Sequence, residues 1–315
     1  MSARFTFRRL EYFVAVGEAG SIAGASQKLN IAPPSISAAI MKLEEEFGMQ
    51  LFARKQAHGL ALTREGRRFF EESKKLLRQA GKLENIAADM RGTASGVLHV
   101  GCLQTVAPIV MPELRKSFEA KHPDARIAQT EDHQAGLLAG LQSADLDVCL
   151  TYDLDLPPDV CFVPLADLPA YVMLPPSHQL SARRVISPAE LRNEPLILLD
   201  LPLSAKYFLS MFHAAKIKPR IAERSKDMAL VRAMVANGFG YSLGNIRPQS
   251  SQSADGKPLK YVPLKSGLRP RRLGLAFCRS DYPTAAAAAF RAHCRKTITG
   301  KNLRVTGAGK NGKPS

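Results

Sequence analysis

The side chains that most often carry covalent or metal chemistry are not arranged here as such chemistry requires. The cysteines are odd in number and include no Cys-x-x-Cys pair, at positions Cys102, Cys149, Cys161, Cys278 and Cys294. Neither a zinc site nor a disulfide framework is therefore expected. The pattern is typical of reduced, mostly buried cysteines in a cytoplasmic protein.

Acid–base chemistry has one candidate pair of carboxylates, Asp145 and Asp147, beside an apolar run. No Gly-x-Ser-x-Gly elbow, P-loop or metal-spaced pair of histidines accompanies them. We expect His99 and His133 to be structural or surface residues. The sequence thus predicts no catalytic residue, no metal and no cofactor. An enzyme is the alternative class of protein, and no motif in the sequence supports it.

The composition indicates a multidomain protein. The 315 residues allow two or three domains, and 45% hydrophobic with 23% charged residues is ordinary for soluble globular proteins. The N-terminus MSARFTFRRLEYF lacks the apolar segment of a signal peptide. No apolar run approaches the roughly 18 residues of a membrane span. We therefore expect a cytoplasmic protein without a membrane partner.

The formal net charge of +16 points to acidic macromolecules as partners. The charge is uneven, because residues 124–200 hold 4 basic and 12 acidic residues, whereas residues 206–272 hold 14 and 3. Residues 1–92 hold 15 basic and 10 acidic residues, so their net positive charge is smaller than that of residues 206–272. Charge alone therefore does not locate a nucleic-acid surface. The asymmetry leaves two explanations open: oppositely charged surfaces that pair between subunits, or an anionic ligand on the basic block.

Residues 1–62 contain three short helical patterns. The first ends near Gly20, and Ser21 is a suitable N-cap for the second. The third occupies 30–48, where apolar residues share one helical face: Ile36, Ile40, Leu43 and Phe47. Two short helices, a tight turn and a third helix predict a helix-turn-helix. Strand-like residues around a polar turn at 56–59 predict a wing.

Residues 63–92 predict one long helix with Thr63 as its N-cap. Apolar residues recur every seven positions along it, at Phe69, Leu76, Leu83 and Met90. This heptad stripe is a surface that two helices can share, so we expect the helix to dimerise. The alternative is a helix that packs this stripe against its own domain.

From about residue 96, apolar runs alternate with helical patterns. The runs predict buried strands at 97–102, 125–130, 147–151, 170–174, 196–199 and 273–278. Helical stretches separate them, such as 227–238, which ends at Gly238. This alternation predicts a doubly wound α/β architecture. Residues 299–315 lack apolar periodicity and predict a disordered basic tail.

Residues 10–66 contain a set of residues at characteristic spacing: Phe13, Val16, Glu18, Gly20, Ser21, Ala25, Leu29, Ser37, Ile40, Leu43, Glu44, Gly48, Leu51, Phe52, Arg54, Leu62, Thr63 and Gly66. These residues match motif positions at fixed spacing, so this segment resembles the DNA-binding region of LysR-type transcriptional regulators. The resemblance continues more weakly through 96–127 and 146–153 to 231–243, and so covers the chain except its tail.

The resemblance implies an α/β protein with an N-terminal all-α winged helix-turn-helix, a linker helix and a two-subdomain effector domain like periplasmic binding proteins. The corresponding segments are 1–62 for the DNA-binding domain, 63–92 for the linker and dimerisation helix, 93–298 for the effector-binding domain and 299–315 for the tail. Within the effector domain, subdomain I comprises about 96–167 and 271–298, and subdomain II about 168–270.

The implied function is sequence-specific regulation of transcription, controlled by a small-molecule effector in the cleft between the subdomains. The implied partners are double-stranded promoter DNA, the effector and further copies of the chain, in a homodimer or a homotetramer. A contact with RNA polymerase is compatible with this function. The alternative is a DNA-binding protein whose cleft holds no ligand.

The third helix departs from the family's Ser-Gln-Pro/Ser-Ala-Leu/Val-Ser-Arg/Lys pattern, because Ala32 replaces Ser, Pro33 replaces Gln and Ala38 replaces the cation. Proline fits the first helical turn, so the helix is retained while amide and guanidinium base contacts are lost. We expect it to contact DNA through apolar carbons and shape more than hydrogen bonds. A domain that has lost DNA binding is the alternative. The expected DNA contacts are Ser21, Lys28, Pro33, Pro34, Ser35, Ser37, Lys42, Arg54 and Lys55.

In this family the effector lies between the subdomains, where strand ends meet helix N-termini. The same place is favoured physically, because ligands of open α/β sheets bind beyond the strands' carboxyl ends. The expected effector contacts are Gln104, Thr105, Tyr152, Asp200 and Ser204. Alternatively, Thr105 and Ser204 cap helices and Asp200 caps its own turn. Asp147 matches a structural position of the family.

Overall fold

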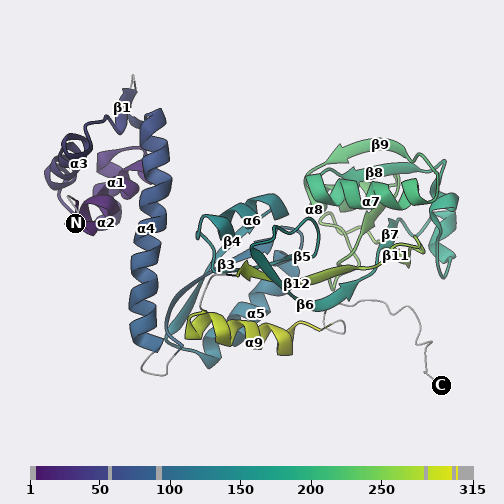
Figure 1. Cartoon of the computed structure of the whole chain (residues 1–315). Coiled ribbons are helices and arrows are strands. Elements are labelled where there is room, and N and C mark those ends of the chain that lie inside the picture. Colours follow the sequence, from purple (N-terminus) through teal and green to yellow (C-terminus); the bar gives the residue numbers. More distant parts are fainter. Residues whose placement is uncertain (1–4, 56–58, 90–93, 280–282, 300–302, 304–315) are drawn as a thin grey trace. The chain divides into compact units, whose positions relative to one another are not determined.

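The structure is a computed structural model that describes residues 5–55, 59–89, 94–279, 283–299 and 303 (Figure 1). The chain divides into two compact units near residue 93. Most of the tail expected at 299–315 lies outside the described residues. Among the helices described, none combines the length and the apolar character needed to cross a membrane.

The N-terminal unit begins with three mutually packed helices, α1 (Phe7–Ala19), α2 (Ile22–Leu29) and α3 (Pro33–Phe47). Ser21 caps α2 by accepting a hydrogen bond from the Gly24 amide at 3.1 Å. Asn30 adopts a left-handed conformation with φ of 55°, which lets the chain turn sharply from α2 into α3. The apolar faces of the helices form two buried clusters, one with Val16, Ala25, Ile36 and Ile40, and one with Leu10, Phe13 and Leu43.

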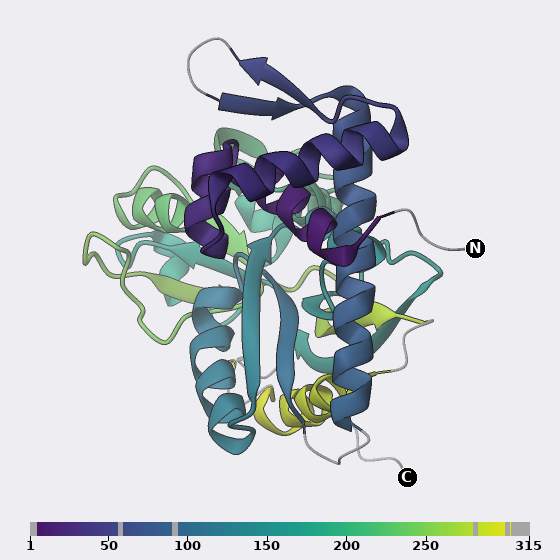
Figure 2. The same ribbon diagram turned by 90° about the vertical axis from the view of Figure 1, so that its left-hand side faces the viewer.

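A hairpin and a long helix complete this unit. β1 (Phe52–Lys55) pairs antiparallel with β2 (Gly59–Leu62) as a wing-like ribbon (Figure 2). Thr63 then caps α4 (Arg64–Asp89) by accepting from the Gly66 amide at 2.8 Å. A side chain at Gly17 would place its Cβ 2.5 Å from the Phe70 ring, so α1 and α4 approach closely only because residue 17 is glycine.

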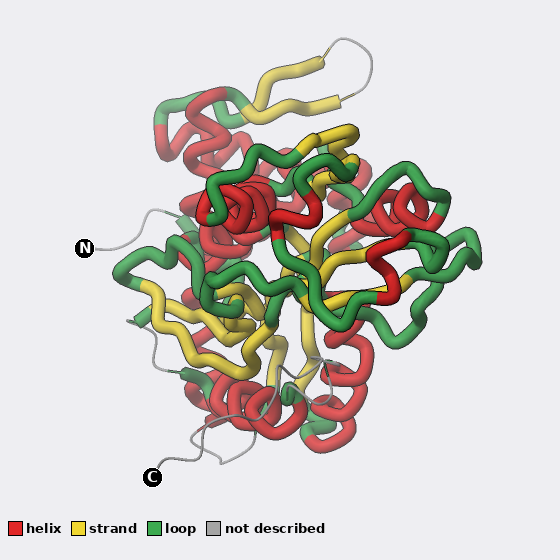
Figure 3. Tube along the Cα trace, turned by 90° about the vertical axis from the view of Figure 1, so that its right-hand side faces the viewer, coloured by secondary structure: helices red, strands yellow, loops and turns green. Residues whose placement is uncertain are grey.

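The second unit contains two subdomains, each built on β-sheet (Figure 3). The first holds a five-stranded sheet of order β4-β3-β5-β12-β6. Its strands are β3 (Gly96–Leu103), β4 (Ala125–Asp132), β5 (Val148–Tyr152), β6 (Val160–Leu168) and β12 (Arg271–Cys278). β3, β4 and β5 are parallel, and β12 runs antiparallel to both β5 and β6. Helices α5 (Ala107–Lys121), α6 (Gln134–Gln142) and α9 (Ala285–Thr297) contribute to its core.

The second subdomain is inserted between β6 and β12. β7 (Tyr171–Leu174) lies between β10 (Ser242–Gly244) and β11 (Lys260–Pro263), antiparallel to both. β8 (Pro195–Leu199) and β9 (Arg220–Ser225) form a parallel pair. The helices are η1 (Gln179–Ala182), η2 (Pro188–Leu191), α7 (Pro202–Ala214) and α8 (Met228–Ala236). Because β12 joins the first sheet after this insertion, the subdomains are linked by more than one chain crossing.

Every apolar run predicted as a strand overlaps a strand of the structure, but β6, β9, β10 and β11 were not predicted. Most side chains of β9 are exposed, so it lacks the apolar run that indicates a buried strand. β6 contains Pro164, which is tolerated because β6 is an edge strand and its register shifts opposite Gly274. The formation of these strands depends on pairing with neighbouring strands more than on the pattern of apolar residues in their own sequence.

Candidate ligand cavity and nucleic-acid interface

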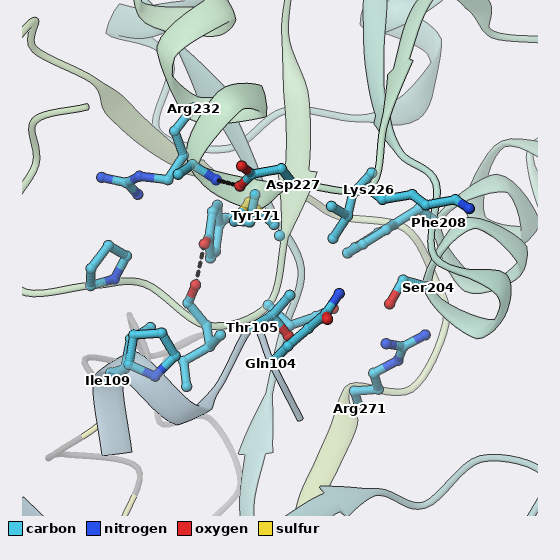
Figure 4. Close-up of a pocket in the computed structure, with 18 of the residues that line it drawn as sticks. Gln104, Thr105, Ile109, Tyr171, Ser204, Phe208, Lys226, Asp227, Arg232 and Arg271 are labelled. Atoms are coloured by element: carbon cyan, nitrogen blue, oxygen red, sulfur yellow. Dashed lines mark hydrogen bonds between the residues drawn. The ribbon is translucent and has the colours of Figure 1, made fainter. Parts of the chain in front are cut away.

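A cavity of about 520 Å³ is lined by both subdomains of the second unit (Figure 4). From the first subdomain its walls include Gln104, Thr105, Pro108, Ile109, Tyr152 and Arg271. From the second they include Tyr171, Ser204, Phe208, Lys226, Met228 and Arg232. A mostly apolar wall with a few polar groups is typical of small-molecule sites. Four of the five expected effector contacts thus line one cavity, and Asp200 is the exception.

Gln104 and Thr105 occupy the turn from β3 into α5. The backbone N–H of Gln104 donates to the backbone carbonyl of Asp132 at 3.1 Å, and this bond attaches the turn to the end of β4. α5 has no side-chain cap, so Thr105 is not used for capping and its hydroxyl is directed elsewhere. Burial raises the pKa of Tyr152, while the Arg271 charge and a hydrogen bond from Thr105 oppose that rise. Thr105, Tyr152 and Arg271 therefore form one polar group on the cavity wall.

Ser204 lies in the first turn of α7, which has no side-chain cap either. Asp200 differs from expectation. Its amide donates to the Ser225 carbonyl at 2.8 Å, and its carboxylate accepts from Arg224 at 3.1 Å. Parallel pairing of Leu199 with Ser225 brings the ends of β8 and β9 together, so Asp200 meets Arg224 and does not line the cavity.

Sequence reasoning missed Arg271, the first residue of β12. The side chain is 2% exposed, and its guanidinium lies 3.9 Å from the Tyr207 ring centroid and 4.6 Å from that of Tyr152. It donates to the Leu203 carbonyl at 3.0 Å and is also hydrogen-bonded to the Tyr152 side chain, while Nε has no partner among the described residues. Burial lowers the pKa of Arg271, although the two tyrosines and Asp153 counteract this. The result is a buried cation that lines the cavity.

A signal for this site existed in the cluster of Arg269, Arg271 and Arg272. Asp153, after β5, accepts from Arg269 at 2.5 Å and from Arg272 at 2.7 Å. Asp153 itself does not line the cavity. Over the part of the chain that the structure describes, no carboxylate lies within 4.0 Å of the Arg271 guanidinium. Only the fold shows which of the three arginines lacks an acidic partner.

Arg232 of α8 is a second arginine on the wall, but its guanidinium is already bonded. It donates to the Tyr261 hydroxyl, to the Gln252 carbonyl at 2.6 Å and to the Ser250 carbonyl at 3.4 Å. These bonds hold the segment between β10 and β11 against the cavity. Lys226 is exposed and also lines the cavity, on the side of the second subdomain (Figure 4).

The other residues considered for chemistry have structural roles. The Asp147 carboxylate accepts from the His99 amide at 2.8 Å and so joins β5 to β3. All five cysteines are free, and burial raises the pKa of the Cys149 thiol to about 12, which keeps it protonated. In the described segments, no three His, Cys, Asp or Glu side chains are grouped as a metal site would require.

α3 presents a short, largely apolar surface. Pro33 and Pro34 occupy its first turn, where their missing N–H groups cost no intrahelical hydrogen bond. Both prolines and Ser35 are exposed, and Ser37 is half-buried. Sequence reasoning did not single out Met41, whose side chain is 60% exposed on the same helix.

Two of the expected DNA-contacting cations, Lys28 and Lys42, are exposed, and each is paired with a glutamate. Lys28 lies 2.6 Å from Glu18, and Lys42 lies 3.7 Å from Glu45. Ion pairs between exposed side chains contribute only about 0–1 kcal/mol, so phosphates can compete for these lysines. The side chains of Arg54 and Lys55, on β1, lie outside the described residues.

The heptad stripe of α4 is divided between two environments. The Phe69 ring packs against Phe13 and Phe47 at centroid distances of 5.4 and 4.7 Å, and Leu76 packs against the same core. Phe69 and Leu76 were expected to contact a second α4 helix, but in the single chain they pack against their own domain, which was the alternative expectation. Leu83 is 69% exposed, and Met90 lies outside the described residues.

Comparison with known proteins identifies both parts of the chain. Residues 7–67 match the family model described as bacterial regulatory helix-turn-helix protein, lysR family. Residues 91–299 match the model described as LysR substrate binding domain. Together the two models span both compact units.

Among the relatives, the transcriptional activator protein LysR of Escherichia coli is 28% identical over 244 residues, 77% of this chain and 78% of that protein. The solved structure of HinK, a LysR family transcriptional regulator from Pseudomonas aeruginosa, is 36% identical, with a TM-score of 0.63 over 94% of this chain and 99% of that one. Full-length CbnR in complex with its target DNA shares the fold, with a TM-score of 0.70 at 24% identity over 93% of this chain and 100% of that one.

Proposed function

Because the chain belongs to the LysR family of DNA-binding transcriptional regulators, we propose that a small organic anion bound in its cavity controls how it binds promoter DNA. The family consists of regulators and not of enzymes. Since the target is promoter DNA, the proposed place of action is the cytoplasm. A contact with RNA polymerase at the promoter belongs to the same proposal.

On the DNA side, the proposed contacts are the exposed first turn of α3 and the lysines beside it. The residues that would face base edges are Pro33, Pro34, Ser35 and Ser37. The residues that would contact phosphates are Ser21, Lys28, Lys42, Arg54 and Lys55. A helix N-terminus suits this position, because its partial positive charge favours phosphate oxygens. CbnR, which is bound to its target DNA in a solved structure, supports the expectation at the level of the fold.

Assembly would use the later part of the heptad stripe. Leu83 and Met90 are the proposed contacts between two α4 helices, because Phe69 and Leu76 already pack within their own domain. A dimer presents two recognition helices to a dyad-symmetric site, and pairing of effector domains would extend it to a tetramer.

The effector class is proposed from one observation: Arg271 is buried, and no acidic residue in the described part of the chain pairs with it. An isolated buried charge costs several kcal/mol, and an anion that pairs with it recovers much of that cost. A carboxylate accepts two parallel hydrogen bonds from a guanidinium, and the unpartnered Nε of Arg271 is available for one of them. Thr105, Gln104 and Ser204 line the same cavity and supply further polar groups.

The rest of the wall restricts the body of this anion. Ile109, Phe208 and Met228 give the cavity an apolar lining away from Arg271. A volume of about 520 Å³ lies within the roughly 300–1,000 Å³ of small-molecule sites. We therefore propose an amphipathic effector, with a single carboxylate on a small aromatic or aliphatic body, in preference to a sugar or a polyphosphate.

The test is thermal unfolding of the full-length protein with a panel of aromatic and aliphatic monocarboxylates and their uncharged amides. A carboxylate at 100 times its Kd stabilises by about 2.7 kcal/mol, or roughly 5–10 °C in Tm, and its amide should have little effect. Arg271→Gln should abolish the shift, and Arg224→Gln, which alters an exposed arginine outside the cavity, should retain it. Equal shifts with carboxylates and amides, or an unchanged shift in Arg271→Gln, would contradict the proposed class.

A further inference from the structure

The exposed face of α3 carries a continuous apolar strip, Pro34, Ala38 and Met41. Positions i, i+4 and i+7 lie above one another on a helix, so the three side chains share one face. The face that packs on the domain core is different, with Ile36, Ile40 and Leu43. A single exposed apolar residue is ordinary, but a strip on one face of a helix indicates a partner surface.

This helix has few side chains that can form hydrogen bonds with base edges. Its sequence, PPSISAAIMKLEEEF, contains no Arg, Asn or Gln, the residues that bond guanine or adenine bidentately. Its one cation, Lys42, lies 3.7 Å from Glu45. Glu44 accepts from the Leu51 and Phe52 amides at 2.7 and 3.2 Å, so it is used inside the domain. The serines and the apolar strip are what remains to contact bases.

The charge along α3 also fixes which end approaches DNA. The first turn has no acidic residue and begins with the strip, whereas the three glutamates gather at the opposite end. The helix N-terminus carries a partial positive charge and favours phosphates, while the glutamates repel them. The strip therefore lies at the end of the helix that a duplex can approach.

We propose that α3 recognises its operator chiefly through thymine methyl groups, which pack against Pro34, Ala38 and Met41 in the major groove. This inference rests on the proposed function, in which α3 enters that groove. The thymine C5-methyl is the apolar group that base edges present there, and it distinguishes T·A from A·T and C·G because it lies on one strand. Short side chains at 34 and 38 allow close approach, and the flexible Met41 can adapt to a methyl farther along.

The experiment begins with selection of duplexes from a random pool by the full-length protein. The selected half-site should contain thymines at fixed positions, and each is then replaced by uracil, which lacks only the methyl. Burial of one methyl is worth about 0.8 kcal/mol, so each contacted position should lose about fourfold in affinity. Uracil at thymines outside the half-site is the control for changes in DNA shape and should have little effect.

A second substitution in the DNA separates the methyl from base pairing. Exchange of a contacted T·A pair for C·G should weaken binding, and 5-methylcytosine in place of that cytosine should restore about fourfold. On the protein side, Met41→Gln keeps the length and helix propensity of the side chain but replaces its apolar end. It should remove the thymine–uracil difference at one position per half-site.

Met49→Gln is the matched control, because Met49 is also exposed but lies beyond the end of α3. This variant should discriminate thymine from uracil as the unmodified protein does. If a duplex is selected but uracil throughout its half-site changes affinity less than twofold, the methyl proposal is wrong while the regulator function stands. If no duplex is enriched over random DNA, sequence-specific binding itself fails, and the proposal fails with it.

Discussion

The Arg271 guanidinium lies over the Tyr207 ring, 3.9 Å from its centroid, and the two residues belong to different subdomains. Arg271 begins β12 of the first sheet, whereas Tyr207 and Leu203, whose carbonyl accepts from Arg271 at 3.0 Å, lie in α7 of the second subdomain. A ligand that pairs with this arginine therefore contacts the junction of the subdomains. Occupancy of the cavity can thereby bias how the two are held, which is what an effector requires.

Removal of the aromatic ring of Tyr207, which lies against Arg271, should weaken binding of the effector. Cation–π contacts contribute about 0.5–2 kcal/mol, so Tyr207→Leu should lower carboxylate affinity by roughly 2- to 30-fold. Tyr207→Phe keeps the ring and should stay within about threefold of the unmodified protein. Isothermal titration with the carboxylate found by thermal shift measures both. Equal losses in the two variants would assign the effect to the hydroxyl and not to the ring.

Charge at Leu83 should separate dimers without unfolding the domain. The side chain is 69% exposed in the single chain, so Leu83→Glu costs little there but places an unpaired carboxylate between two α4 helices. We expect the dimer dissociation constant, measured by sedimentation, to rise at least tenfold. Phe69→Ala is the contrast, because it removes the ring contacts with Phe13 and Phe47 and should lower thermal stability instead. Unaltered assembly of Leu83→Glu would exclude α4 as the dimer surface.

Asp153 should stabilise the fold in a pH-dependent way. Burial alone would raise the pKa of Asp153, but hydrogen bonds from Arg269 and Arg272 outweigh it and hold the pKa below its usual value. A depressed folded pKa gives stability that is present above the unfolded pKa of about 3.9 and is lost as pH falls below it. Asp153→Asn should therefore cost about 1–2 kcal/mol in urea unfolding at pH 7, and the difference should shrink below about pH 4.

Asp155→Asn is the matched control for this change. Asp155 is exposed and pairs with Lys206 at 3.3 Å, so its loss should cost less than about 0.5 kcal/mol at any of these pH values. A cost of Asp153→Asn that stays constant from pH 7 to pH 3 would show that the carboxylate charge is not what stabilises the fold.

Lys42 should contribute to affinity through salt-dependent contact with a phosphate. Each neutralised phosphate adds about −0.9 to the slope of log affinity against log salt concentration. Because a dimer presents two copies of Lys42, Lys42→Ala should make this slope shallower by about 1.8 and weaken all duplexes to a similar extent. Lys116→Ala, on α5 of the second unit, should leave the slope unchanged. A preserved slope in Lys42→Ala would remove this lysine from the phosphate contacts.

The helix-turn-helix was predictable because its determinants are local. Helical spacing of Ile36, Ile40 and Leu43 defines a buried face, and Ser21 and Thr63 cap the helices that follow them, as expected. The turns after β3 and β8 also followed from the sequence, because an apolar run followed by polar residues marks a strand end. Gln104, Thr105 and Ser204 beside these turns, and Tyr152 at the end of β5, were expected at the cavity from the strand ends together with the family resemblance, and they line it.

Other features depend on residues far apart in the chain. Phe69 continues a heptad repeat, yet Phe13 and Phe47 meet it because α1 and α3 pack beside α4. Asp200 follows a strand as Ser204 does, but the register of β8 with β9 brings Arg224 to it. Local pattern cannot distinguish these cases, because it does not specify which distant partner arrives.

Arg271 shows the same division most clearly. The sequence by itself determined the family, the alternation of strands and helices and a cluster of three arginines at the end of subdomain II. Only the tertiary structure decided that Asp153 pairs with Arg269 and Arg272, while Arg271 is buried on the cavity wall with no carboxylate of the described residues paired to its guanidinium. The physical reason is that desolvation and ion pairing are set by the packing of β12 against β5 and α7, a contact between segments that are distant in sequence.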